Sequence, residues 1–270
     1  MLYFQLGSEK LFCGFYHFRF QPASDFQLGF PVTLLHSLGT DHRLWKYQIP
    51  AFSKFTDCIL APDSRGHGLS TYNTNIGLNE WVEDTKALLD RLDIQSTVLC
   101  GVSLGGVEAL AFALSYPERV RALVVADTFS SVPKEQVESK IQATAGLAEK
   151  EGMHVYANSY LNVTITGSET AQKIRPELYS AIAEMSLDVY KKSAEVCFRV
   201  DLDTKLAKIQ VPTLVLIGEQ DFKTPIDMAQ KLVGSIKNSR LEIVPSAGHL
   251  SNIDNPNDFN SKVEAFLRTI

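Results

Sequence analysis

Short apolar runs that alternate with longer helical stretches constrain the fold of this chain more than any other feature. The runs are rich in Val, Leu and Ile, which is typical of strands buried on both faces of a parallel sheet. The stretches between them, such as 78–92 and 257–269, repeat apolar residues at three- and four-residue intervals, which predicts amphipathic helices. The alternation predicts an α/β fold whose mostly parallel, twisted sheet has helices on both faces. The runs are 31–36 (PVTLLH), 57–62 (DCILAP), 96–102 (STVLCGV), 120–127 (VRALVVAD), 211–218 (VPTLVLIG) and 241–244 (LEIV).

One segment interrupts the alternation. Residues 131–207 contain no strand run and show helical spacing, with Val137, Ile141 and Ala148 on one helix and Leu178, Ile182, Met185 and Val189 on another. The first 20 residues resemble an antiparallel pair, which brings the sheet to about eight strands. We therefore expect a core in two parts, 1–130 and 208–270, with a helical cap at 131–207. A cap there covers the strand ends, where such sheets bind ligands.

The composition limits the classes of partner that we expect this protein to bind. The formal net charge is −5 and the pI about 5.7, without a basic cluster to follow a phosphate backbone, so we expect no nucleic-acid partner. Apolar runs are too short to span a bilayer.

The four cysteines lack metal-binding spacing, and we expect buried thiols in a cytoplasmic protein. We expect no metal and no cofactor. Residues 1–10 lack signal-peptide features, and whether 1–8 are native or a tag remnant stays open.

The motif G-x-S-x-G occurs where an apolar run meets a helical stretch. Gly101 and Gly105 flank Ser103, with a strand ending at Val102 and a helix beginning near Leu104. So tight a reversal predicts a positive φ at the serine and no room for a side chain two residues on either side. The serine hydroxyl then stands at a helix N-terminus, where N–H groups stabilise developing negative charge. Ser103 is therefore the predicted nucleophile.

A serine nucleophile needs a base and an acid that orients the base. His249 follows the last strand run, and Asp221 follows the run 211–218. Both loops open at the same sheet edge as Ser103, in the chain order Ser, Asp, His. Asp127 ends the run 120–127 at that edge and is the rival acid.

Two backbone N–H groups are needed to stabilise the oxyanion. We assign them to Leu104, directly after the nucleophile, and to Leu38, in the loop after 31–36. His36 is interpreted as shaping that loop. Asp63, together with Arg65, is interpreted as tying the glycine-bearing loop that follows 57–62.

These motifs together resemble the α/β-hydrolase superfamily over nearly the whole chain. The stretches LLHSLGTDHRLW, LAPDSRGHGLS, GVSLGG, GEQDFKTP and AGHLSN occur in that family's order. HSLGT, DSRGHGLS and AGHLSN are similar to those of 3-oxoadipate enol-lactonases, which act in the β-ketoadipate branch of aromatic degradation. The elbow departs from that family's usual Leu-Ser-Met-Gly-Gly, since Val102 and Leu104 flank Ser103 here.

The resemblance implies hydrolysis of a small enol-lactone through an acyl-enzyme. The alternatives are a general carboxylesterase or perhydrolase of small esters, and a small-molecule receptor with slow turnover. A carboxylated substrate calls for a cation, and Arg43 and Trp45, just after the oxyanion loop, are the candidate substrate-binding residues. The oligomeric state, a homo-oligomer included, stays open.

Overall fold

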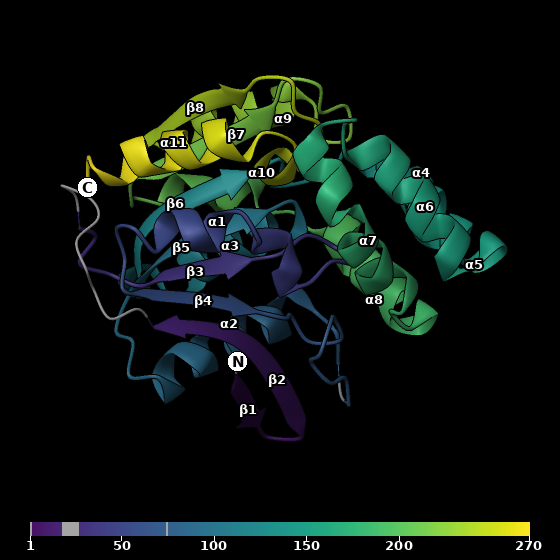
Figure 1. The fold of residues 1–270 in the computed structure, drawn as a ribbon, viewed down its shortest axis with the longest axis horizontal. Helices are drawn as coiled ribbons and strands as arrows, with labels where there is room; N and C mark the ends of the chain where they lie inside the picture. The colour runs from purple at the N-terminus through teal and green to yellow at the C-terminus, as the bar shows by residue number, and fades with distance from the viewer. Residues whose placement is uncertain (1, 18–26, 74) are drawn as a thin grey trace.

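The chain folds around one mostly parallel sheet, seen in a computed structural model that describes residues 2–17, 27–73 and 75–270 (Figure 1). Among these residues the sheet has eight strands in the order β1-β2-β4-β3-β5-β6-β7-β8. Strands β3 to β8 are mutually parallel, and β2 is antiparallel to both β1 and β4. The strands are β1 (Leu2–Leu6), β2 (Glu9–His17), β3 (Val32–Leu35), β4 (Cys58–Pro62), β5 (Thr97–Val102), β6 (Val120–Ala126), β7 (Thr213–Gly218) and β8 (Ser239–Val244).

Burial along the strands follows their place in the sheet. Every residue of the inner strands β3, β4, β5 and β7 is buried, as continuous apolar runs require when both faces are covered. The edge strands β1 and β8 are mostly half-buried or exposed. The predicted parallel sheet and the antiparallel pair at the N-terminus are both confirmed, although residues 18–20 of the predicted pair lie outside the described residues.

Helices cover both faces of the sheet. Helix α1 packs beside α11, and in Figure 1 both lie in front of the strands. Helix α3 packs against β3, β5 and β6 on the other face and contacts α2, while α9 packs on β7 and β8. These core helices are α1 (Gln48–Phe52), α2 (Leu78–Arg91), α3 (Leu104–Ser115), α9 (Ile226–Ser235), α10 (Ser251–Asp254) and α11 (Pro256–Leu267).

The segment between β6 and β7 is helical. In Figure 1 it lies beyond the arrowheads of the parallel strands, at the edge where their carboxyl ends meet. Its helices are α4 (Lys134–Ile141), α5 (Leu147–Glu151), α6 (Met153–Thr164), α7 (Glu169–Ala183) and α8 (Leu187–Arg199), with a π-helical turn η3 (Gln142–Gly146) between α4 and α5. This placement positions the insertion over the sheet edge at which the predicted site residues lie.

No helix in the described residues is long and apolar enough to cross a membrane. The four cysteines are all buried and free.

Candidate active site

Ser103 occupies a strained turn between β5 and α3. Its backbone has φ 56° and ψ −116°, a region that residues other than glycine rarely adopt. The turn is fixed from both sides, since the Ser103 N–H donates to Ala126 O at 2.9 Å and the Thr128 hydroxyl donates to Ser103 O at 2.6 Å. The positive φ predicted from the motif is therefore present.

The two glycines of the motif are required by close backbone contacts. A Cβ on Gly101 would lie 2.1 Å from the Gly105 carbonyl oxygen, and one on Gly105 would lie 2.0 Å from the Leu35 carbonyl oxygen. Both distances are far below any contact between real atoms, so only glycine lets α3 begin this close to the sheet.

The loops that carry His249 and Asp221 leave neighbouring strands. Gly218 at the end of β7 pairs with Val244 at the end of β8, so the two loops begin side by side. His249 Nε2 lies 3.0 Å from Ser103 Oγ, and His249 Nδ1 lies 2.9 Å from Asp221 Oδ2. The structure thus brings the three predicted side chains into one hydrogen-bonded chain, and all three are buried.

Asp221 is held by the loop that follows it. The N–H groups of Lys223 and Thr224 donate to Oδ1 at 2.8 and 3.1 Å, and the Thr224 hydroxyl donates to Oδ2 at 2.5 Å. Burial alone would raise the pKa of this carboxyl, but His249 and the donors from Thr224 hold the pKa below its usual range. The carboxylate therefore stays ionised and oriented toward the imidazole.

The rival acid, Asp127, has other partners. Its Oδ1 accepts from Gly218 N–H at 2.8 Å, and its Oδ2 accepts from the Ser251 N–H at 3.0 Å and hydroxyl at 2.6 Å. Burial, with the charge of Asp221 nearby, raises the pKa of Asp127. Asp127 therefore connects the end of β7 to the segment just after His249, and its oxygens are engaged there rather than by the imidazole.

Ser103 and His249 open onto a cavity of about 280 Å³ beneath the helical insertion. This is near the lower end of the ~300–1,000 Å³ typical of small-molecule sites. Its walls are mostly apolar and come from the core and the insertion alike. The lining residues are Leu38, Ser103, Phe129, Val132, Lys140, Ala143, Thr144, Tyr160, Val163, Cys197, Phe198, Lys223, Thr224, Met228 and His249.

The two predicted oxyanion residues lie at this cavity or beside its serine. Leu38 lines the cavity. Leu104 is the first residue of α3, where the helix leaves its N–H without an internal acceptor. Gly39, with φ 76°, turns the chain directly after Leu38. Both N–H groups therefore belong to segments next to Ser103.

The prediction that Arg43 and Trp45 bind substrate is not supported by their positions, because neither lines this cavity. The Trp45 side chain is completely buried in the core. Arg43 binds Asp41, with its Nη2 2.6 Å from Asp41 Oδ2, and faces a different hollow, lined also by Gly66 and Ser180. An arginine and a tryptophan are residue types that can bind a carboxylated substrate, but the sequence did not show that Arg43 pairs with Asp41, two residues earlier.

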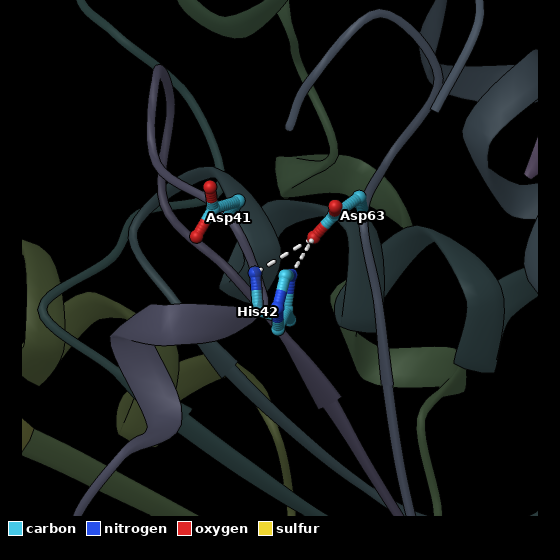
Figure 2. A group of neighbouring side chains, drawn as sticks. All are labelled: Asp41, His42 and Asp63. Atoms are coloured by element: carbon cyan, nitrogen blue, oxygen red, sulfur yellow. Dashed lines mark hydrogen bonds and ion pairs between the residues drawn. The ribbon is translucent and has the colours of Figure 1, made fainter. Parts of the chain in front are cut away.

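The cluster of Asp41, His42 and Asp63 brings three possible metal ligands within 4.8 Å of one another (Figure 2). Figure 2 shows both the backbone N–H and the ring Nδ1 of His42 directed at Asp63 Oδ1, at 2.7 and 2.8 Å. Asp63 Oδ2 accepts from Leu69 N–H at 2.8 Å, and Arg43 occupies both oxygens of Asp41. With each carboxylate oxygen already engaged, the cluster serves to join two loops.

Asp63 therefore does tie its own loop, but not through Arg65 as expected. Arg65 instead binds Asp84 of α2 with two hydrogen bonds, of 2.8 and 2.7 Å.

Among the cavity residues that sequence reasoning missed are its two lysines, Lys140 of α4 and Lys223 of the β7–α9 loop. Lys223 carried a usable signal, because it lies two residues after the predicted acid. Lys140 carried none, since the orientation of α4 depends on how the insertion packs.

A serine at a strand-to-helix elbow, hydrogen-bonded to a histidine from the loop after the last strand, is the site arrangement of α/β hydrolases. The sequence model of the alpha/beta hydrolase fold matches residues 31–256, and the chain belongs to this family.

Particular relatives are similar over most of the chain. It is 32% identical to 3-oxoadipate enol-lactonase 2 of Acinetobacter baylyi over 238 residues, which cover 86% of each protein. The enol-lactonase of Burkholderia xenovorans LB400 superposes with a TM-score of 0.87 at 26% identity, covering 99% of this chain and 100% of that one. A thermophilic esterase of Thermogutta terrifontis shares the fold, with a TM-score of 0.83 at 24% identity and coverage of 97% and 94%. These proteins are hydrolases, and so is this chain.

Proposed function

We propose that this protein is a serine hydrolase that opens a small carboxylated enol-lactone of the 3-oxoadipate enol-lactone type. The observation that carries the proposal is the chain of hydrogen bonds from Ser103 through His249 to Asp221, opening onto a small apolar cavity. The enol-lactonases among its relatives support this choice of substrate. The buried free thiols fit a reducing compartment, so we assign the protein to the cytoplasm. The proposed substrate assigns the reaction to the β-ketoadipate pathway.

The first half-reaction forms an acyl-enzyme. His249 Nε2, which lies 3.0 Å from Ser103 Oγ, takes the hydroxyl proton as the oxygen attacks the lactone carbonyl carbon. The resulting oxyanion accepts hydrogen bonds from the Leu38 and Leu104 N–H groups. When the ring C–O bond breaks, its electron pair passes to the enol oxygen, which receives the proton from His249. The enol then ketonises.

The second half-reaction releases the product. His249 takes a proton from water, the hydroxide oxygen attacks the ester carbonyl, and the bond to Ser103 Oγ breaks as His249 returns the proton. Asp221 holds the imidazole in one tautomer and stabilises its charged form in both halves. Acid–base help of this kind contributes about 10²–10⁴-fold in rate.

The proposal is tested by steady-state hydrolysis of 3-oxoadipate enol-lactone and of p-nitrophenyl acetate, with wild type and Ser103→Ala. We expect a much larger kcat/KM for the lactone and a loss of at least about 10³-fold in the variant. Equal or better activity on the simple ester would reassign the protein as a carboxylesterase or perhydrolase. A single burst without turnover on either substrate would indicate a receptor.

A further inference from the structure

The charges that line the active-site cavity are unbalanced. Lys140 and Lys223 both line it, and no carboxylate does so among the residues that the structure describes. Lys140 comes from the last turn of α4, in the insertion, and Lys223 from the β7–α9 loop of the core. Two elements far apart in sequence therefore each contribute a cation to the same small space.

The Lys140 side chain reaches the loop that carries Lys223, and both lysines line the cavity. Lys140 Nζ lies 3.3 Å from the Lys223 carbonyl oxygen, and Lys223 Nζ lies 4.5 Å from the centroid of the Tyr160 ring. Within the described parts of the chain, no carboxylate oxygen lies within 4.0 Å of either ammonium group. Asp221 is close enough to act electrostatically on Lys223, but its oxygens are occupied by His249 and by the loop N–H groups.

The surroundings of Lys223 disfavour its charged form. Burial lowers the pKa of Lys223 to about 8, and the positive charge of Lys140 acts in the same direction. An anion bound between the two ammonium groups would relieve both effects, since each lysine would gain a charge-assisted hydrogen bond.

We propose that Lys140 and Lys223 form the subsite that binds the carboxylate of the substrate, while the lactone carbonyl lies at Ser103. The inference rests on the proposed function and adds the residues that distinguish an anionic substrate from a neutral one. The pair takes the role that the sequence had suggested for Arg43 and Trp45. Because one cation comes from the insertion, substrate binding also bridges the insertion and the core.

The test compares two substrates that differ in one charge: 3-oxoadipate enol-lactone and its carboxyl methyl ester, both followed by loss of the enol-lactone absorbance. We expect Lys223→Met and Lys140→Met each to lower kcat/KM for the acid by about 10-fold to 100-fold, mainly through KM. Activity on the methyl ester should stay within about threefold of wild type, because the ester cannot use the charge. Lys223→Arg should retain most of the preference for the acid.

The matched control is Lys134→Met, at an exposed position in the first turn of the same helix α4, which should leave both activities unchanged. An unchanged ratio of acid to ester activity in both cavity variants would overturn the proposal. So would an equal loss on both substrates, which would indicate that the lysines only position the triad loop.

A binding measurement separates this inference from the proposed function. Calorimetry measures binding affinity and needs no turnover. The two ligands are levulinate, a small keto-carboxylate that is not hydrolysed, and the neutral levulinamide. If wild type fails to open the lactone, weaker levulinate binding by Lys223→Met with unchanged levulinamide binding would still support the subsite. Equal binding of levulinate by both proteins would overturn it.

Discussion

Two buried aspartates that follow neighbouring strands have different hydrogen-bond partners. Asp221 faces the His249 imidazole, whereas Asp127 accepts hydrogen bonds from Gly218 and Ser251. Both follow an apolar run, so sequence position alone could not separate them. The geometry supports Asp221 as the acid that we propose, whereas the hydrogen bonds of Asp127 connect the end of β7 to the segment just after His249.

This difference gives a paired prediction at the residue scale. Asp221→Asn should lower kcat by about 10³–10⁴-fold with little change in stability, because the imidazole loses the partner that fixes its tautomer. Asp127→Asn replaces an acceptor oxygen by a donor opposite an N–H group, which should cost about 1–3 kcal/mol of unfolding free energy. Steady-state kinetics and thermal unfolding of both variants make the comparison. An Asp127→Asn enzyme as inactive as Asp221→Asn, with an unchanged Tm, would assign the acid role to Asp127 instead.

At the residue scale, the sequence predicted which side chains the structure brings together where a motif fixes their positions. Ser103, Asp221 and His249 follow strands, and strand ends in a parallel sheet share an edge. The sequence did not indicate where the Arg43 and Trp45 side chains lie, because Arg43 pairs with Asp41, two residues earlier, and Trp45 is packed into the core. Lys140 was missed because periodicity predicts which face of a helix is apolar but does not predict how α4 is oriented relative to the cavity.

The elbow is the element on which the site depends most. Gly101→Ala would place a methyl group 2.1 Å from the Gly105 carbonyl oxygen, and the backbone on both sides is fixed by β5 and α3. Over-packing of this kind costs about 1–3 kcal/mol or more. We expect a lower Tm and lost turnover together, measured by thermal unfolding and lactone hydrolysis. The control is Gly234→Ala in α9, where an added Cβ would meet no atom within 4 Å, so it should cost no stability. A Gly101→Ala protein with wild-type Tm and activity would contradict the crowded elbow.

Helix boundaries in the insertion were only partly predictable. Leu178, Ile182, Met185 and Val189 share a helical spacing, yet they do not lie on one helix. Leu178 and Ile182 lie on α7, which ends at Ala183, Val189 lies on α8, which begins at Leu187, and Met185 lies between the two helices. All four side chains are buried, before and after the break, so the apolar spacing continues through it and periodicity did not detect it. Helix α6 and the π-helical turn before α5 carried no distinct signal in the sequence.

At the scale of the whole molecule, Glu108 links three parts of the core from within. It lies on α3, completely enclosed, and accepts hydrogen bonds from Thr85 of α2 at 2.8 Å and from Ser64, in the loop after β4, at 3.3 Å. Burial raises the pKa of Glu108 to about 8, with Asp84 nearby acting in the same direction. The carboxyl group is therefore protonated in the folded protein at neutral pH.

The consequence is a pH-dependent stability. Because the folded pKa lies above the unfolded value, the stabilisation is fully present below about pH 4.5 and is lost as pH rises through about 8. Glu108→Gln has the same shape but does not titrate. From pH 6 to pH 8 the wild type should therefore lose on the order of 2 kcal/mol of unfolding free energy relative to the variant. Urea unfolding at both pH values measures the difference. A constant difference between the two proteins would mean that Glu108 does not titrate with folding.

The global architecture was the most predictable level. Inner strands buried on both faces leave continuous apolar runs, and these fix the parallel sheet and the place of the helical insertion. How the insertion packs over the strand ends depends on contacts between segments distant in sequence, and it is this packing that determines the shape and charge of the cavity.

The central claim is that Ser103 is the nucleophile of a hydrolytic site, and covalent trapping tests it most directly. The protein is incubated with a small p-nitrophenyl alkylphosphonate, and the adduct is measured by intact mass and located by peptide mapping. We expect one adduct per chain on Ser103, none in Ser103→Ala, and slower labelling in Asp221→Asn. Labelling of Ser103→Ala at the wild-type rate, or an adduct located on another residue, would contradict the claim.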